Sequence, residues 1–344
     1  MQQLQGYEDR TEHVCLLVKT LYGLKQVGRE WNIEFDTKLQ RCRYMQLCCD
    51  PCIYIWHVND DFVIITVWVD DLLIFTTTVD LMTKAKSDIS TEWEVTDLGE
   101  PSKIVGIEIT RTEDSIAILQ KKYIEHILSK EGMKRSNAVL TPLDPNVLLM
   151  PNLEGNISNR SNSFARLLGE LQYLANATHP DITYAVNRLV SYTANPSLQH
   201  VTALKHILQY LSGTRDLGIV YKTLPHQVNF FHGYADAAYR NHDDLKFTTR
   251  YVFFAGDGAI TWSSKKQITK ALSSTEAKYV ALSEAVCEAC WLRHLYGKLG
   301  LFDKTMPMLI RGDNEGAIAM TKNPMYHQCF KHIDLHVHWI CNLV

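Results

Sequence analysis

The stretch that decides the fold of the first part of the chain is DFVIITVWVDDLLIF, residues 61–75. β-Branched and aromatic residues dominate it, and two adjacent aspartates, Asp70 and Asp71, divide it into two apolar runs. This pattern predicts two strands joined by a tight turn. Charges inside an apolar hairpin are costly unless they are compensated. Two interpretations stay open: an exposed two-residue turn, or an acidic pair presented to bind a divalent metal.

Outward from this hairpin, the spacing of apolar residues indicates helices in some segments and strands in others. Residues 31–42 have helical spacing, and residues 136–162 collect Pro, Gly, Asn and Ser, which is typical of a linker or long loop. Further helices are predicted over residues 163–178, 182–194, 198–214, about 275–299 and 314–323. Further strands are predicted over residues 52–58, 228–239, 248–256, 259–264 and 307–313.

These breaks predict three parts, residues 1–135, 136–227 and 228–344, in a chain of the α+β class. A length of 344 residues is too great for one small domain, and 46% hydrophobic residues are enough to bury a core, which excludes disorder. The net charge of −3 identifies no partner, although the first part is acidic and the other two are slightly basic.

The nine cysteines are odd in number and scattered, which does not indicate a disulfide framework. We therefore expect a reducing, intracellular setting. The first residues lack a basic flank followed by an apolar core, and the longest apolar run, residues 62–69, is too short to span a bilayer. The sequence predicts neither export nor a membrane partner.

Four carboxylates in the last part are candidates for chemistry, and each has a structural alternative. Asp236 interrupts an aromatic strand, where a charge needs a reason. Glu276 opens the long predicted helix three residues after Ser273, so it also fits a capping box. Asp313 ends a strand and could instead cap the next helix, and Asp334, in HIDLHVH, could lie on a solvated helix face.

Four phrases together resemble one known family. They are LYGLKQVGREWN (residues 21–32), WVDDLLIF (68–75), TDLGEPSKIVGIEI (96–109) and KKQITKALSSTEAKYVALSEA (265–285). In family order, they resemble the reverse transcriptase and ribonuclease H of Copia-type LTR retrotransposons. The resemblance implies an incomplete reverse-transcriptase palm, then a helical thumb and connection, then an α/β ribonuclease H-like domain with a mixed sheet, in the three predicted parts.

The resemblance makes Asp70 and Asp71 the paired aspartates of the polymerase palm. It places Lys25 and Gln26 in the palm beside the template and primer. The family's third aspartate and its fingers lie upstream of LYGLKQ, and this sequence begins after them. Two-metal phosphoryl transfer needs carboxylates from both palm strands. We therefore expect polymerase activity to be lost from this chain.

The resemblance also assigns Asp236, Glu276, Asp313 and Asp334 to the metal site of a ribonuclease H. Two Mg²⁺ ions, or Mn²⁺ in their place, would activate a water and stabilise the leaving oxygen at a phosphodiester of the RNA strand in an RNA/DNA hybrid. The same resemblance places His327 near the scissile phosphate, where it would help the product leave.

Other residues bear on the binding of nucleic acid. Trp262, Lys265 and Lys266 combine an aromatic ring with two cations, which indicates a hybrid-binding edge, or else a polar loop around a half-buried Trp. Arg250 replaces a family Gly and is expected to strain a turn, and Lys278 replaces a common Glu. The alternative function is an inactive fragment that binds nucleic acid or a protein. A second copy of the chain and other Pol products stay open as partners. The cytoplasm, the nucleus and a virus-like particle stay open as compartments.

Overall fold

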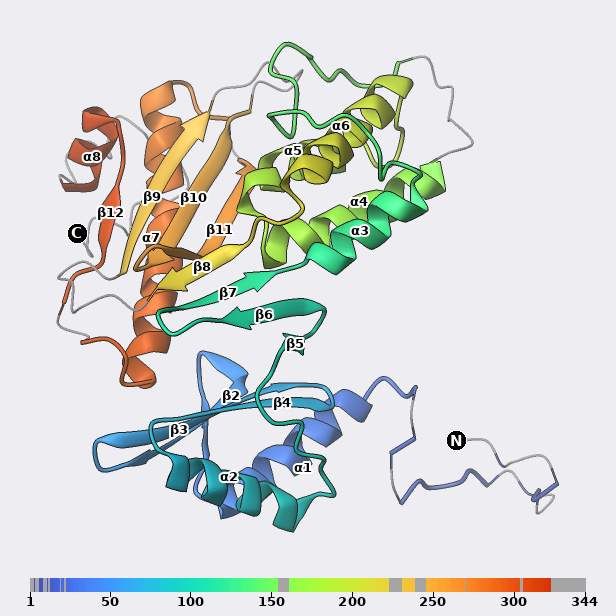
Figure 1. Cartoon of the computed structure of the whole chain (residues 1–344), viewed down its shortest axis with the longest axis vertical. Helices are drawn as coiled ribbons and strands as arrows, with labels where there is room; N and C mark the ends of the chain where they lie inside the picture. The colour runs from blue at the N-terminus through green and yellow to red at the C-terminus, as the bar shows by residue number, and fades with distance from the viewer. Residues whose placement is uncertain are drawn as a thin grey trace. The chain divides into compact units, whose positions relative to one another are not determined.

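A computed structural model describes residues 23–153, 161–222, 231–238, 246–268, 270–303 and 306–322, with scattered positions before residue 23. Its internal contacts divide the chain into two compact units, Met1–Leu98 and Gly99–Val344 (Figure 1). Helices and strands are mixed in both units, which confirms the α+β class. The seven cysteines among the described residues, which include Cys15, form no disulfide.

The first unit is a four-stranded antiparallel sheet covered by two helices (Figure 1). In chain order its elements are α1 (Val27–Arg41), β1 (Met45–Leu47), β2 (Asp50–Val58), β3 (Asp61–Trp68), β4 (Asp71–Thr76) and α2 (Val79–Glu92). Val63, Ile65 and Val67 alternate along β3 and share one buried core with Leu39 of α1 and Ile89 of α2. Side chains two residues apart on a strand point to the same face, so both helices pack on that face.

The predicted hairpin of residues 61–75 is confirmed. Trp68 pairs with Asp71, so Val69 and Asp70 form a two-residue turn between β3 and β4. Asp70 and Asp71 are both exposed at this tip. Their carboxylates therefore stay in water, and the desolvation penalty of a buried charge does not arise.

The turn holds a β-branched residue in the left-handed region of backbone space, because Val69 has φ 53°. That conformation costs an L-residue about 1–2 kcal/mol, whereas glycine avoids the clash and loses about 0.5–1 kcal/mol of backbone entropy. We expect Val69→Gly to stabilise the first unit by up to about 1 kcal/mol in urea unfolding. The matched control is Val67→Gly, two residues earlier in the buried core, which should destabilise it. A loss of stability in Val69→Gly would contradict the turn geometry.

The second unit begins with another antiparallel sheet, in the order β5 (Lys103–Ile104), β6 (Ile107–Arg111), β7 (Ser115–Leu119) and β8 (Ile219–Lys222). Between β7 and β8 the chain forms α3 (Lys121–Lys130), α4 (Ser161–Ala177), a 3-10 turn η1 (Pro180–Ile182), α5 (Thr183–Val190) and α6 (Leu198–Thr214). These helices bury a common core that includes Ile127, Leu171, Val186 and Leu208. The three helices predicted between residues 163 and 214 are confirmed, although the middle one begins with η1 and ends at Val190.

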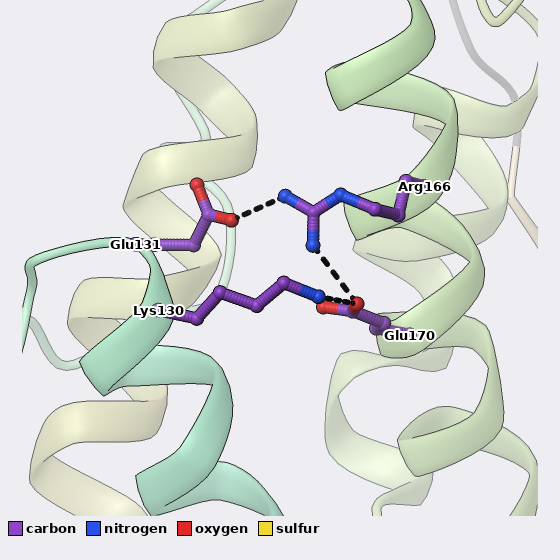
Figure 2. A network of polar contacts seen from close by, with 4 residues as sticks. All are labelled: Lys130, Glu131, Arg166 and Glu170. Atoms are coloured by element: carbon purple, nitrogen blue, oxygen red, sulfur yellow. Dashed lines mark hydrogen bonds and ion pairs between the residues drawn. The ribbon is translucent and has the colours of Figure 1, made fainter.

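Polar side chains tie the end of α3 to α4 (Figure 2). Lys130 Nζ lies 2.7 Å from Glu170 Oε1, and Arg166 Nη1 lies 3.0 Å from the same oxygen. Arg166 Nη2 also lies 2.7 Å from Glu131 Oε1. Glu170 therefore keeps an arginine partner when Lys130 is removed.

The first turn of helix α6 contains a buried histidine, His200, whose neutral form is needed for a capping hydrogen bond. The Ser197 backbone N–H donates to His200 Nδ1 at 2.8 Å, and the imidazole ring is completely buried. Burial is the main cause that lowers the pKa of His200 below its ordinary value of 6.5. Protonation of Nδ1 would remove the acceptor of this capping hydrogen bond.

Stability should therefore fall in mild acid. Below pH 6.5 the unfolded chain binds a proton at His200 that the folded chain excludes. The contribution of neutral His200 to the free energy of unfolding is therefore complete above pH 6.5 and is lost as the pH falls toward the pKa of the folded state. The slope is at most about 1.4 kcal/mol per pH unit for one group. In urea unfolding, we expect the free energy of unfolding of His200→Gln to fall less steeply than that of the wild type between about pH 7.5 and 5.5. A remainder should persist from His179, whose pKa burial also lowers. An unchanged slope would contradict this assignment.

The last sheet has the order β11-β10-β9-β12. Its strands are β9 (Phe231–Ala238), β10 (Thr248–Ala255), β11 (Gly258–Lys266) and β12 (Leu309–Arg311), with helices α7 (Ser274–Lys298) and α8 (Glu315–Lys322). β9, β10 and β11 are antiparallel, whereas β12 runs parallel to β9, so the sheet is mixed. Ala235 and Phe253 share a core with α7, and Ala237 contacts Ala277 and Ala281 of the same helix. Tyr234 and Asp236 therefore lie on the opposite face of β9.

Candidate functional site

Two of the predicted acids meet at a lysine. Asp236 lies in β9, and Asp313 lies two residues beyond β12, the parallel neighbour of β9. Lys278, in the second turn of α7, reaches both: its Nζ is 2.5 and 2.6 Å from the two oxygens of Asp313 and 3.2 Å from Asp236 Oδ1. Three separate elements thus place two carboxylates around one ammonium group.

Lys278 and Asp313 form an ion pair that persists throughout the neutral range. The hydrogen bond from Lys278 holds the pKa of Asp313 below its ordinary value of 3.8, and the same bond is the main cause that raises the pKa of Lys278 above 10.5. The Lys278 side chain is only 19% exposed, whereas that of Asp313 is 67% exposed. Solvent therefore reaches the acids more freely than the lysine that joins them.

The structure supports a role at the start of a helix for Glu276 and not for Asp313. Glu276 is buried, its backbone N–H donates to Ser273 Oγ at 3.1 Å, and its Oε2 accepts from the Leu272 N–H at 2.6 Å. The helix-start role weighed for Glu276 is therefore present in the structure. Asp313 does not cap α8, because Asn314 Oδ1 accepts the Ala317 N–H at 2.7 Å.

Asp236 and Asp313 are the described candidates for holding a divalent cation. Asp236 and Asp313 already share one cation, and carboxylate oxygens are the ligands that Mg²⁺ prefers. Their carboxylate oxygens are chemically suited to hold such an ion, and metal binding by these two residues remains a prediction. Within the described ranges, no group of three or more His, Cys, Asp or Glu side chains is arranged to bind a metal. Asp334 and His327 fall outside the described residues.

A cleft of about 880 Å³ opens beside the acids. One wall is the sheet face opposite α7, and the other is η1 and the start of α5. Aromatic rings, arginines and the two acids all contribute to the lining, including Tyr184, Tyr234, Asp236, Trp262, Arg311 and Asp313. Rings and cations on one concave surface are the combination that binds nucleic-acid bases and phosphates.

Both arginines of the cleft are fixed against tyrosine rings. The Arg250 guanidinium lies 4.6 Å from the ring centre of Tyr184, and that of Arg311 lies 5.4 Å from the ring centre of Tyr234. The expected turn strain at Arg250 is wrong. Arg250 lies inside β10, directly opposite Asp236 on β9, and its φ is not positive. An extended strand accommodates its side chain without a glycine.

Trp262, Lys265 and Lys266 all belong to β11, and each has a different environment. Trp262 lines the cleft while its Nε1 donates to the Ala175 carbonyl of α4 at 2.7 Å, so it also holds the sheet against the helices. Lys265 Nζ lies 3.1 Å from Glu284 Oε2. Lys266 is exposed at the end of the strand. Hybrid binding by these residues stays a prediction.

In the first unit, Lys25 and Gln26 are exposed immediately before α1, and Gln26 is its N-cap residue. Asp70 and Asp71 stand at the β3–β4 tip of the same unit. Contact of the first pair with template and primer, and metal binding by the second pair, remain predictions.

The family model for "Reverse transcriptase (RNA-dependent DNA polymerase)" matches residues 1–145. The whole chain aligns at 36% identity with 26% of the retrovirus-related Pol polyprotein from transposon TNT 1-94 of Nicotiana tabacum. It also aligns in full, at 35% identity, with 23% of the corresponding polyprotein from transposon RE1 of Arabidopsis thaliana. The chain belongs to the Copia-type retrotransposon Pol family.

The Copia-type chain spans about a quarter of the length of these two Pol polyproteins. A shorter relative, the putative transposon Ty5-1 protein of Saccharomyces cerevisiae, is 27% identical over 82% of the chain, and the match covers 91% of that relative. The family confirms the resemblance seen in the four sequence phrases and confirms the reverse transcriptase domain. None of the helices described in the Copia-type chain is long and apolar enough to span a bilayer.

Sequence reasoning missed several cleft residues of the Copia-type chain. Tyr234 stands two residues before Asp236 in β9, so the strand period of two places both on one face. Arg311 is the last residue of β12, two positions before Asp313. That spacing was available in the sequence. Tyr184 carried no such signal, because it reaches the cleft from α5, far away along the chain.

Proposed function

We propose that the Copia-type chain carries a ribonuclease H that hydrolyses the RNA strand of RNA/DNA hybrids. Asp236, Glu276 and Asp313 are its acids among the described residues, and Asp334 and His327 complete the set assigned from sequence. The observation that supports the proposal most directly is that Asp236 in β9 and Asp313 just after β12 share the Lys278 ammonium and line a cleft with aromatic rings and arginines.

Each described residue has a task in this proposal. The rings of Tyr234 and Trp262 offer faces on which bases stack, and Arg250 and Arg311 offer guanidinium groups to phosphate oxygens. Asp236 and Asp313 hold a divalent cation, Mg²⁺ or Mn²⁺. When bound, that ion supplies Lewis-acid stabilisation of the phosphate and lowers the pKa of water. Glu276 is the third described acid of the proposed set, and it also fixes the start of α7 and with it the position of Lys278.

A cleavage assay on the full chain tests this proposal. A labelled RNA/DNA hybrid should be cut in the RNA strand when Mg²⁺ or Mn²⁺ is present, and a chelator should stop the reaction. Single-stranded RNA and double-stranded DNA of the same sequence are the matched controls and should remain intact. Absence of any cut hybrid with either metal would refute a ribonuclease H function.

For the first unit we propose that Lys25 and Gln26 contact template–primer and that Asp70 and Asp71 are the acidic pair of the reverse transcriptase domain. Lys25 is exposed, and one lysine–phosphate contact typically changes the salt slope of binding by about 1. Lys25→Glu should therefore weaken template–primer binding in gel-shift titrations and lower that slope. Equal affinity and equal slope in the variant would remove Lys25 from the interface.

One observation favours a second function, binding without turnover. Lys278 already neutralises the acids that a metal would need, so the cleft can hold a nucleic acid while the acids stay paired with the lysine. In that case hybrid binding weakens with salt, as expected for contacts to phosphates, and no cut product forms with Mg²⁺ or Mn²⁺. Salt-dependent binding together with cleavage would exclude this second function.

A further inference from the structure

The ammonium group of Lys278 lies where a metal ion would have to bind. Its Nζ is within 2.6 Å of both oxygens of Asp313 and 3.2 Å from Asp236 Oδ1. The lysine reaches this position from α7, whose start is fixed by the Ser273 and Glu276 hydrogen bonds. Its side chain is mostly buried, so the cation is held in place by the fold.

The lysine and a divalent ion compete for the same carboxylate oxygens. A metal bound by these oxygens at about 2.0–2.2 Å would leave no room for hydrogen bonds from an ammonium in the same position. Like charges a few ångströms apart also repel, and the repulsion doubles for a divalent ion. Binding of a metal therefore requires the Lys278 ammonium to leave both acids.

We infer that Lys278 is a tethered competitor of the divalent cation: it occupies the site shared by Asp236 and Asp313 and must be displaced before a metal binds. The inference rests on the two acids of the proposed function but needs no turnover. It assigns a role to a residue that was noted in the sequence only as a replacement for a common Glu.

The competition has two consequences of opposite sign. Without metal, Lys278 screens the repulsion between two carboxylates, so removing it should lower the stability of the metal-free chain. With metal, removing it eliminates the competitor, so the affinity for the ion should rise. A purely structural lysine would produce the first effect without the second.

The experiment measures Mn²⁺ binding to the full chain by isothermal titration calorimetry. We expect Lys278→Met to bind Mn²⁺ roughly tenfold more tightly than the wild type, and Lys278→Arg, which keeps the charge, to stay near the wild type. The matched control is Lys130→Met, which removes an ammonium from Glu170 in the same unit and should leave Mn²⁺ affinity unchanged (Figure 2). Adding Asp236→Asn to Lys278→Met should abolish the gain.

Lys278→Gln is the second variant if the methionine variant does not fold. Equal Mn²⁺ affinity in wild type and in the uncharged variant would overturn the inference, and so would a lack of Mn²⁺ binding in both. The hybrid-cleavage assay separates this result from the proposed function. Tighter Mn²⁺ binding without cleavage supports the competitor and refutes the ribonuclease H, whereas cleavage with unchanged affinity does the reverse.

Discussion

Asp236→Asn should lower the rate of hybrid cleavage by about 10²- to 10³-fold, the size typical of losing one electrostatic contact to a transition state. The amide keeps the shape of the side chain and removes the charge that holds a cation. Because Asp236 lies in the middle of β9 on the face away from α7, the substitution leaves the core contacts of Ala235 and Ala237 in place. Initial rates on a labelled hybrid at saturating Mg²⁺ measure the effect.

The matched control is Asp257→Asn, which makes the same chemical change in the exposed β10–β11 turn of the same sheet. It should cleave at the wild-type rate. Cleavage that survives Asp236→Asn would place the reaction elsewhere in the chain. An equal loss in both variants would show that the assay reports a general effect of charge on hybrid binding.

The second large effect concerns the core beneath the site. The Phe253 side chain is fully buried between β10 and α7, so Phe253→Ala should lower the free energy of unfolding by about 3–5 kcal/mol. A Cβ added at Gly233 on the neighbouring strand would lie 2.4 Å from the Phe253 ring. Gly233→Ala alone should therefore cost about 1–3 kcal/mol through overpacking.

The two substitutions should compensate each other, because the alanine at position 233 would enter space that the missing ring leaves. In urea unfolding the double variant should be less destabilised than the sum of the two single variants. The control is Gly169→Ala at an exposed position of α4, where an added Cβ meets nothing within 4 Å, and stability should rise slightly. Simple additivity at positions 233 and 253 would contradict the packing described for β9 and β10.

Elements with a strong local pattern were predictable from the sequence. Helix α6 spans the predicted residues, and the β3–β4 hairpin lies where its two apolar runs indicated. The sheet of β5 to β8 was missed, because its strands are two to five residues long and β8 finds its partner only across the helices. Helix α2 was also missed, although Thr78, whose side chain accepts the Leu81 N–H, is a capping signal in the sequence.

The sequence predicted which acidic residues belong to the candidate site, but it did not predict the contacts between their side chains. Asp236 and Asp313 stood out as charges at a strand and a strand end. Their joint contact with Lys278 depends on how α7 packs on the sheet and how β12 pairs with β9, which no local pattern specifies. Arg250 was misjudged because a replaced glycine suggested a turn, whereas the pairing of β10 with β9 makes that position an ordinary strand residue.

The pairing of β7 with β8 has a consequence for how the chain reaches its native state. Ile118 is the partner of Ile219, so the strands come together only after about a hundred intervening residues have been looped out. Contacts so distant along the chain slow folding, whereas the helices between them form from nearby residues. We therefore expect a refolding intermediate in which α3 to α6 are protected from hydrogen exchange before β8 is. β8 also supplies Tyr221, whose hydroxyl donates to the Ala259 carbonyl of β11, so this contact with the cleft sheet would form in the slowest step.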